Sequence, residues 1–340
     1  MLRLPKFELA LPTTVAEATA LLAEAQGEAQ VVAGGTDLVP NMKHELFTPR
    51  LVVSLAKVEA LRGICVTDDG GLAIGAMTTL EEVAASPEVR GRAPALAQAA
   101  SLVAGPQLRS MGTLGGNVML DTRCQWYNQT HFWRQALGFC LKKDGTVCHV
   151  VEKGNKCVAA ASNDTAPALM TLGAVLAISG PDGSREVAID DFWTADGIYN
   201  KKLGSAELLC EVRVPPTGAG HRGAYGKLRD RGSIDFPLLG VAARLELDAQ
   251  GAVTDADLVL TALAAQPKRV KQVAATLAGA RPDSEAFDDA VAAVAELAYK
   301  QCRPMPNIPG DHDYRREMVP VYVRRTLRAA ADGTGPVHHL

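Results

Sequence analysis

The chain has 340 residues, of which 47% are hydrophobic and 21% are charged, and its formal net charge is −3. This length corresponds to two or three compact units, and the nearly balanced charge excludes the strong field that attracts nucleic acid or an anionic membrane surface. The longest uncharged apolar stretch, Ala166–Ile178, is too short to span a membrane, and without a signal-peptide pattern the expected location is the cytoplasm.

The first region, residues 1–57, has the pattern of a helix between strands. Thr14-Val15-Ala16-Glu17 is a capping box, in which the Thr hydroxyl accepts from the Glu amide and the Glu side chain bonds back. The helix is expected to continue to Gln26. Apolar strands are expected at Ala29–Ala33 and Leu51–Leu55, so the region is predicted to be an α/β unit.

The second region, residues 58–218, shows strand and helix signals on both sides of a cysteine-rich stretch. Asp68-Asp69-Gly70-Gly71 indicates a hairpin turn, and Gly105-Pro106 ends a helical run. The expected elements are strands at Gly63–Thr67 and Leu72–Ala76, helices from Thr79 and over Ala93–Ala104, and apolar α/β segments at Ala166–Ser179 and Leu208–Val214.

The third region, residues 219–340, follows a linker-like segment rich in proline and glycine. Strands followed by helices favour an α+β domain in which the helices cover one face of the sheet. The expected elements are strands at Leu238–Leu247 and Ala256–Leu263 and helices at Val270–Leu277, Ser284–Gln301 and Arg315–Ala331.

Two glycine pairs follow apolar segments and are candidates for binding phosphate. Val31–Leu38 contains Gly34-Gly35-Thr36, and Thr113–Asn117 contains a second pair. Glycine allows positive φ and close approach of the backbone to a ligand, so successive amides can point at an anion. The alternative is a pair of tight turns without a ligand. The chain has no G-x-G-x-x-G, which argues against a Rossmann dinucleotide site.

Four of the seven cysteines lie close together in the sequence. Cys124, Cys140, Cys148 and Cys157 have the spacing C-x15-C-x7-C-x8-C, and Asp144-Gly145 and Gly154-Asn155 indicate turns that bring them together. A structural zinc site usually has paired C-x2–4-C knuckles, which are missing here. Unconnected structural thiols are a further alternative. A [4Fe–4S] cluster tolerates wider spacing, and five aromatic residues in the same stretch would exclude water from it.

These motifs resemble the flavin subunits of the xanthine dehydrogenase family over nearly the whole chain. The resemblance is carried by AGGTDL at 33–38, TLGGN at 113–117, NDTAPAL at 163–169, Glu207–Val212 and Tyr225-Gly226-Lys227. It implies that FAD binds with its pyrophosphate between the glycine loops, with Asp164 hydrogen-bonded to the flavin, and with Leu209 and Lys227 beside the ring. For Lys227, a solvated strand position is the alternative. The implied cofactor-binding residues are Val31, Val32, Ala33, Gly34, Gly35, Thr36, Asp37, Leu38, Thr113, Gly116, Asn117, Asp164, Leu209 and Lys227.

The cysteine-rich insert, residues 118–163, is similar to that of 4-hydroxybenzoyl-CoA reductases, notably at Asp121–Gln129. That resemblance implies a [4Fe–4S] cluster on the four clustered cysteines, which receives electrons from a ferredoxin. It also implies two partners, a large subunit with a molybdopterin cofactor and a small subunit with [2Fe–2S] clusters. The substrate, an aromatic acyl-CoA, would be dehydroxylated in the large subunit, so no catalytic residue is expected here.

The expected architecture is therefore α+β. It has a two-part FAD-binding domain of the molybdenum-hydroxylase flavoprotein type, interrupted by an iron–sulfur lobe, and a C-terminal sheet-and-helix domain. Two rivals remain: a flavin subunit of a molybdenum hydroxylase that sends electrons outward to NAD or another acceptor, and a non-redox scaffold with a zinc-stabilised loop.

Overall fold

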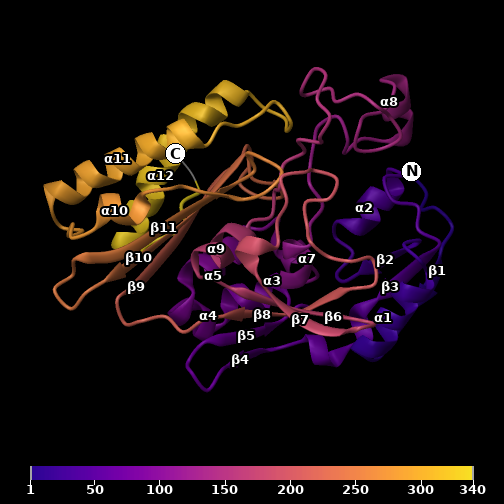
Figure 1. Cartoon of the computed structure of the whole chain (residues 1–340), viewed down its shortest axis with the longest axis horizontal. Coiled ribbons are helices and arrows are strands. Elements are labelled where there is room, and N and C mark those ends of the chain that lie inside the picture. The colour runs from indigo at the N-terminus through magenta and orange to yellow at the C-terminus, as the bar shows by residue number, and fades with distance from the viewer. Residues whose placement is uncertain (1, 339–340) are drawn as a thin grey trace.

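A computed structural model describes residues 2–338, so the outermost residues of the first and last expected domains, 1 and 339–340, lie outside the described residues. Figure 1 shows a central α/β body, a C-terminal sheet with its helices to one side, and a small lobe that carries α8 above the body. Within residues 2–338, no helix is both long and apolar enough to cross a membrane.

The N-terminal unit is a parallel sheet of three strands in the order β1-β3-β2. The strands are β1 (Glu8–Ala10), β2 (Ala29–Val32) and β3 (Leu51–Ser54), with α1 (Val15–Glu24) and the short α2 (Leu38–Lys43). The predicted capping box is confirmed, because Thr14 accepts from the Glu17 amide at 3.1 Å. Ala18 and Leu22 of α1 pack with Val53 and Leu55 in the core of this unit.

The second unit is a five-stranded antiparallel sheet in the order β4-β5-β8-β6-β7. The predicted hairpin is confirmed by the pairing of β4 with β5. Helix α7 contains both glycines of the second pair, where the sequence predicted a loop. The elements are β4 (Ile64–Val66), β5 (Leu72–Gly75), α3 (Leu80–Ala85), α4 (Pro87–Arg92), α5 (Pro94–Ser101), α6 (Pro106–Arg109), α7 (Leu114–Val118), α9 (Thr165–Thr171), β6 (Val175–Gly180), β7 (Gly183–Ala188) and β8 (Leu208–Val214).

The C-terminal unit is an antiparallel sheet, β12-β11-β10-β9, with three helices. Its elements are β9 (His221–Leu228), β10 (Leu239–Leu247), β11 (Val253–Thr261), β12 (Lys268–Arg269), α10 (Val273–Leu277), α11 (Glu285–Gln301) and α12 (His312–Ala331).

Strand β9 was not among the expected elements, although a strand position was the alternative for Lys227, because glycine weakens strand propensity and β9 contains two glycines. The structure supplies the reason for Gly226: a Cβ there would lie 2.3 Å from Thr326 Oγ1, so its absence lets α12 pack tightly on the sheet. Helix α12 begins earlier than predicted because Asp311 caps it through the Asp313 and Tyr314 amides.

The insert consists mainly of turns, with one short helix, α8 (His131–Ala136). Its base is a small antiparallel bridge in which Arg123 and Ala160 exchange backbone hydrogen bonds of 2.8 and 2.7 Å. Its own core is small and takes Leu46 from the N-terminal unit. The lobe therefore lies where the N-terminal unit, the central sheet and the C-terminal unit meet.

Candidate functional site

A cavity of about 520 Å³ lies between the N-terminal unit and the central sheet. Its volume is in the range typical of cofactor sites. Four segments form most of its wall: 33–38 after β2, 112–117 around the start of α7, 203–209 at the start of β8, and 234–236 from the C-terminal unit. The cavity is therefore built by residues that are far apart in the sequence.

The first glycine pair turns the chain from β2 into α2. Gly35 has φ of 72°, a left-handed conformation that glycine adopts without strain. Behind the turn, Asp37 accepts hydrogen bonds from Asn41 Nδ2 at 3.0 Å and from an Arg123 guanidinium nitrogen at 3.1 Å. Burial raises the pKa of Asp37, and the nearby guanidinium opposes that rise. The turn thus places backbone in the cavity wall and is anchored to the base of the insert.

The second glycine pair has two separate roles. A Cβ on Gly115 would lie 2.6 Å from the Ala76 Cβ, so this position is needed for packing. Gly116 is exposed to the cavity, and its amide donates to the Thr113 hydroxyl at 3.0 Å. Asn117 Oδ1 accepts from the amide and hydroxyl of Thr165, which ties α7 to α9. Gly116 is therefore the position at which a side chain would occupy the space of a ligand.

Asp164, Lys227 and Tyr225 form a buried polar group beside the cavity. Lys227 Nζ donates to Asp164 Oδ2 at 3.0 Å and to the Leu102 carbonyl at 2.9 Å, while the Tyr225 hydroxyl donates to Asp164 Oδ1 at 2.8 Å. Lys227 is 0% exposed, which corrects the alternative of a solvated strand residue. Burial raises the pKa of Asp164 and lowers that of Lys227, and the contact between them opposes both shifts.

The cavity wall contains the expected cofactor-binding residues except Val32 and Lys227. Val32 packs beside Gly35, with one of its methyl groups 3.5 Å from where a Gly35 Cβ would be. Lys227 lies behind Asp164, which is in the wall. Sequence reasoning missed segment 234–236, because a short irregular loop carries no local signal that it will fold onto a cavity formed by the other units.

The four clustered cysteines line one pocket, here called the cysteine pocket. The Val151 amide donates to Cys148 Sγ and the Ala159 amide to Cys157 Sγ, each at 3.4 Å. Burial raises the pKa of Cys124 to about 12, with smaller contributions from the other three thiols. The volume of this pocket is about 20 Å³, which leaves room for about one water molecule.

The separation of the sulfurs bears on which metal they would hold. Among the described residues, no three of these sulfur atoms lie within 4.8 Å of one another. A tetrahedral zinc ion with Zn–S bonds of 2.3 Å needs sulfurs roughly 3.8 Å apart. The four thiols are therefore not arranged as a ready-made tetrahedral zinc site.

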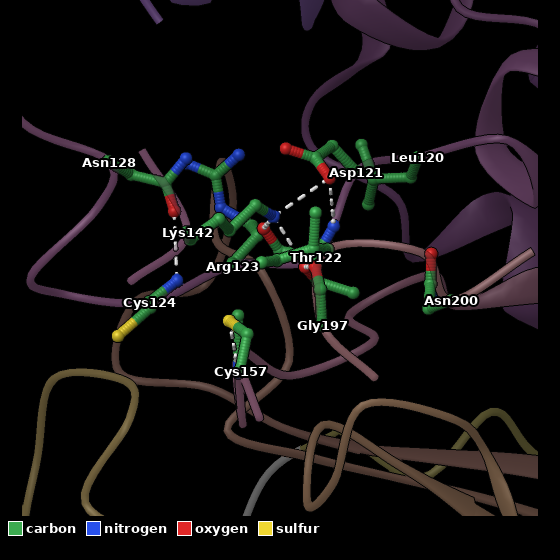
Figure 2. A network of polar contacts seen from close by, with 12 residues as sticks. Leu120, Asp121, Thr122, Arg123, Cys124, Asn128, Lys142, Cys157, Gly197 and Asn200 are labelled. Atoms are coloured by element: carbon green, nitrogen blue, oxygen red, sulfur yellow. Dashed lines mark hydrogen bonds and ion pairs between the residues drawn. The ribbon is translucent and has the colours of Figure 1, made fainter. Parts of the chain in front are cut away.

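Polar residues lie between the cysteine pocket and the main cavity and form a wall there, and Figure 2 shows the contacts among three of them, Asp121, Thr122 and Lys142. Lys142 lines the pocket, Asp121 lines the cavity, and Lys142 Nζ lies 2.8 Å from Asp121 Oδ1. The Thr122 hydroxyl donates to the Gly197 carbonyl. The backbone amide of Gly197 in turn donates to the Cys157 carbonyl at 2.8 Å. Nearby, burial lowers the pKa of Lys201 to about 8.

Comparisons with known proteins cover nearly the whole chain. Residues 5–217 match the family described as the FAD binding domain in molybdopterin dehydrogenase, and residues 223–330 match the CO dehydrogenase flavoprotein C-terminal domain. The carbon monoxide dehydrogenase medium chain of Hydrogenophaga pseudoflava is 31% identical over 328 residues, which are 96% of this chain and 97% of that one. The putative xanthine dehydrogenase FAD-binding subunit of Escherichia coli strain K12 is 27% identical and is matched over 95% of each chain.

The same likeness holds in three dimensions. One chain of a carbon monoxide dehydrogenase from Hydrogenophaga pseudoflava, a form that lacks the Mo-pyranopterin moiety of the molybdenum cofactor, superposes with a TM-score of 0.79. The two are 29% identical, and the match covers 98% of this chain and 100% of that chain.

Proposed function

The chain belongs to the FAD-binding subunits of the molybdenum hydroxylase family, and from this premise we propose that it moves electrons between FAD and a [4Fe–4S] cluster carried on its own insert. FAD is the cofactor of the matched domain, so the chain is an oxidoreductase subunit. The cluster, its electron donor and the substrate are the parts that we propose.

The main cavity fits FAD. Gly116 leaves open a space that a side chain would fill, and the turn at Gly35 places backbone in the wall, both suited to a pyrophosphate. Asp164 and Leu209 lie in the same wall and would contact the flavin moiety. When bound, the flavin supplies chemistry that joins two-electron and one-electron steps, while the protein orients it and excludes water.

A single observation carries the proposal of the cluster: four cysteines from the insert line one pocket, and three of the four are buried. Amides that donate to two of the sulfurs would stabilise the negative charge of thiolates. The wall of Asp121, Thr122 and Lys142 connects this pocket to the FAD cavity. Electrons that enter at the pocket would therefore have a short way to the flavin.

The partners follow from the same argument. The three remaining cysteines, Cys65, Cys210 and Cys302, are fewer than the four thiolates that a further [2Fe–2S] cluster needs. We therefore assign [2Fe–2S] clusters to a small partner subunit and the molybdopterin cofactor, with the substrate, to a large one. The relative named a medium chain supports such an assembly.

The proposal has two further parts. Electrons enter from a low-potential donor such as a ferredoxin, and the large subunit dehydroxylates an aromatic acyl-CoA such as 4-hydroxybenzoyl-CoA. It is supported by the insert, whose Asp121–Gln129 stretch resembles that of 4-hydroxybenzoyl-CoA reductases. The relatives are named dehydrogenases, which favours a second candidate: a flavin subunit that sends electrons outward to NAD or another acceptor.

Metal and flavin analysis of the anaerobically purified protein tests the cluster. For a [4Fe–4S] cluster we expect about four iron and four acid-labile sulfide atoms per chain, together with FAD. Cys148→Ala should lose the iron and retain FAD, whereas Cys65→Ala, at an exposed position, should change neither. Zinc without iron would refute the cluster and leave a plain FAD subunit.

Stopped-flow reduction distinguishes the two directions. If the proposal holds, reduced ferredoxin reduces the wild-type flavin rapidly, and Cys148→Ala blocks this route while a small dye still reduces FAD directly. Rapid reduction by NADH together with no reaction with ferredoxin would instead support the outward-directed flavin subunit.

A further inference from the structure

The ion pair of Lys142 and Asp121 is placed between two sites. Lys142 belongs to the insert, lies two residues after Cys140 and lines the cysteine pocket. Asp121 lies at the start of the insert and lines the FAD cavity. Lys142 Nζ contacts Asp121 Oδ1 at 2.8 Å, as Figure 2 shows. The lysine of the pair therefore borders the cysteine pocket, and the carboxylate borders the flavin site.

Lys142 is held in a single position. Its side chain is 6% exposed, and Nζ also donates to the Thr122 carbonyl at 2.8 Å and to the Thr122 hydroxyl. These contacts use all three hydrogens of the ammonium group. The ammonium also lies 4.3 Å from the centre of the Tyr127 ring. A lysine fixed in this way keeps its charge at one distance from each site.

Asp121 is also fixed, and the positive charges of Arg123 and Lys201 act on it in addition to that of Lys142. Its Oδ1 accepts from Lys142 and from the Thr122 amide at 2.9 Å. Its Oδ2 is buried and has no hydrogen-bond partner among the described residues. A buried charge is weakly screened, so its effect on a neighbouring redox centre is larger than that of a surface charge.

The sign of the effect follows from the orientation. One electron added to either centre makes that centre more negative by one charge. A nearby cation stabilises the added charge and raises the reduction potential, while a nearby anion does the reverse. Because the cation is on the cluster side and the carboxylate on the flavin side, the pair acts on the two centres in opposite directions.

We propose that the Lys142–Asp121 pair is a fixed dipole that raises the reduction potential of the cluster and lowers that of FAD. This inference rests on the proposed cluster. It assigns a tuning role to two residues that bind neither cofactor through a ligand bond.

A purely structural role is the competing explanation, since the same pair also joins the insert to the body of the protein. Redox potentials separate the two. Loss of a structural link would loosen both cofactors or neither, whereas a dipole predicts shifts of opposite sign when its two ends are removed one at a time.

The experiment is a redox titration of the purified holoprotein, in which electron paramagnetic resonance follows the cluster and absorbance follows the flavin. Lys142→Met should lower the reduction potential of the cluster by about 59 mV, which for one electron is a roughly tenfold change in the ratio of oxidised to reduced cluster at a given potential. Asp121→Asn should raise the flavin potential by a similar factor, about 30 mV for two electrons. Lys142→Arg, which keeps the charge, should leave the cluster potential close to the wild-type value.

The matched controls are Lys143→Met, at the next position with a side chain 35% exposed, and Asp182→Asn in the exposed β6–β7 turn. Shifts no larger than those of the controls, or shifts of the reverse sign, would overturn the dipole. If the Lys142→Met variant loses its cluster, the test rests on the Asp121→Asn variant. An unchanged flavin potential in that variant overturns the proposal. Wild-type protein without iron would refute the proposed cluster and this inference with it, while iron with unshifted potentials refutes only the inference.

Discussion

The contact between Lys227 and Asp164 places two charges in the interior of the protein. Lys227 is fully buried, and Asp164 is 2% exposed. Removing one partner of a buried ion pair leaves the other charge uncompensated, which typically costs about 3–5 kcal/mol. Here the pair also joins β9 of the C-terminal unit to α9 of the central unit, so it holds two domains together beside the flavin site.

We therefore expect Lys227→Met to lower the free energy of unfolding by about 3–5 kcal/mol. Denaturant unfolding of the purified protein measures this. Lys202→Met, at an exposed position, is the control and should be within about 0.5 kcal/mol of wild type. The direct placement of Lys227 against the flavin ring remains a prediction from the sequence. A stable Lys227→Met variant with a lowered flavin potential would favour that placement over a structural role.

Gly116 allows a test of the flavin site that does not depend on backbone strain. Its φ is not positive and it lies in α7, so a side chain is acceptable to the backbone but would project toward the cavity. We expect Gly116→Val to reduce the FAD content of the purified protein at least tenfold, while its far-ultraviolet circular dichroism stays unchanged.

The control for Gly116 is Gly91 in α4, where an added Cβ meets nothing within 4 Å. Gly91→Val should retain full FAD occupancy. Full occupancy in Gly116→Val as well would show that the pyrophosphate lies elsewhere in the cavity.

At the scale of elements, the insert has too little core to be stable by itself. Its buried cluster contains three of the cysteines with Leu46, Tyr127 and Ala159. The insert of 46 residues, 118–163, is close to the size of about 40 residues below which a segment usually needs a metal, a disulfide or a partner to fold. Two further contacts anchor the insert: Arg134 donates to the Glu45 carbonyl at 3.1 Å, and Asn307 donates to the Val158 carbonyl at 2.6 Å.

Removal of the metal should therefore unfold the insert locally and leave the rest of the chain folded. After chelation under oxidising conditions, hydrogen–deuterium exchange should increase strongly in peptides from residues 124–157. Peptides from β10, which is almost completely buried, are the internal reference and should not change. Equal protection of the insert before and after removal would mean that its fold does not depend on the metal.

The whole molecule is organised around a cavity to which all three units contribute. Residues 33–38 come from the N-terminal unit, 112–117 from the central unit, and 234–236 from the C-terminal unit. The guanidinium of Arg123 lies 3.8 Å from the centre of the Phe236 ring, which connects the base of the insert to the same wall. A ligand in this cavity contacts every unit, so its binding should couple their stabilities.

We accordingly expect FAD to stabilise the chain as one body. At a free FAD concentration 100 times the dissociation constant, the gain is about 2.7 kcal/mol. Differential scanning calorimetry should show one transition that moves to higher temperature as FAD is added to the apoprotein. Two transitions, of which only one responds to FAD, would contradict the coupling of the units.

The sequence determined the features that depend on neighbours along the chain. The capping box at Thr14, the hairpin at Asp68–Gly71 and the glycine pair at Gly34-Gly35 each act within a few residues, so their patterns predicted the observed turns and helix start. The insert was also evident from the sequence, because two turns in a short segment keep its four cysteines close together in space.

The tertiary structure decided everything that depends on residues far apart in sequence. Only the fold shows that glycine-containing β9 is a buried strand, because the close approach of α12 makes Gly226 necessary. Only the fold turns Lys227 inward onto Asp164, and only the fold sets Lys142 against Asp121 in the wall between two sites. Local patterns encode capping and turns, whereas burial and charge pairing arise when distant segments pack, and no short window of sequence contains both partners.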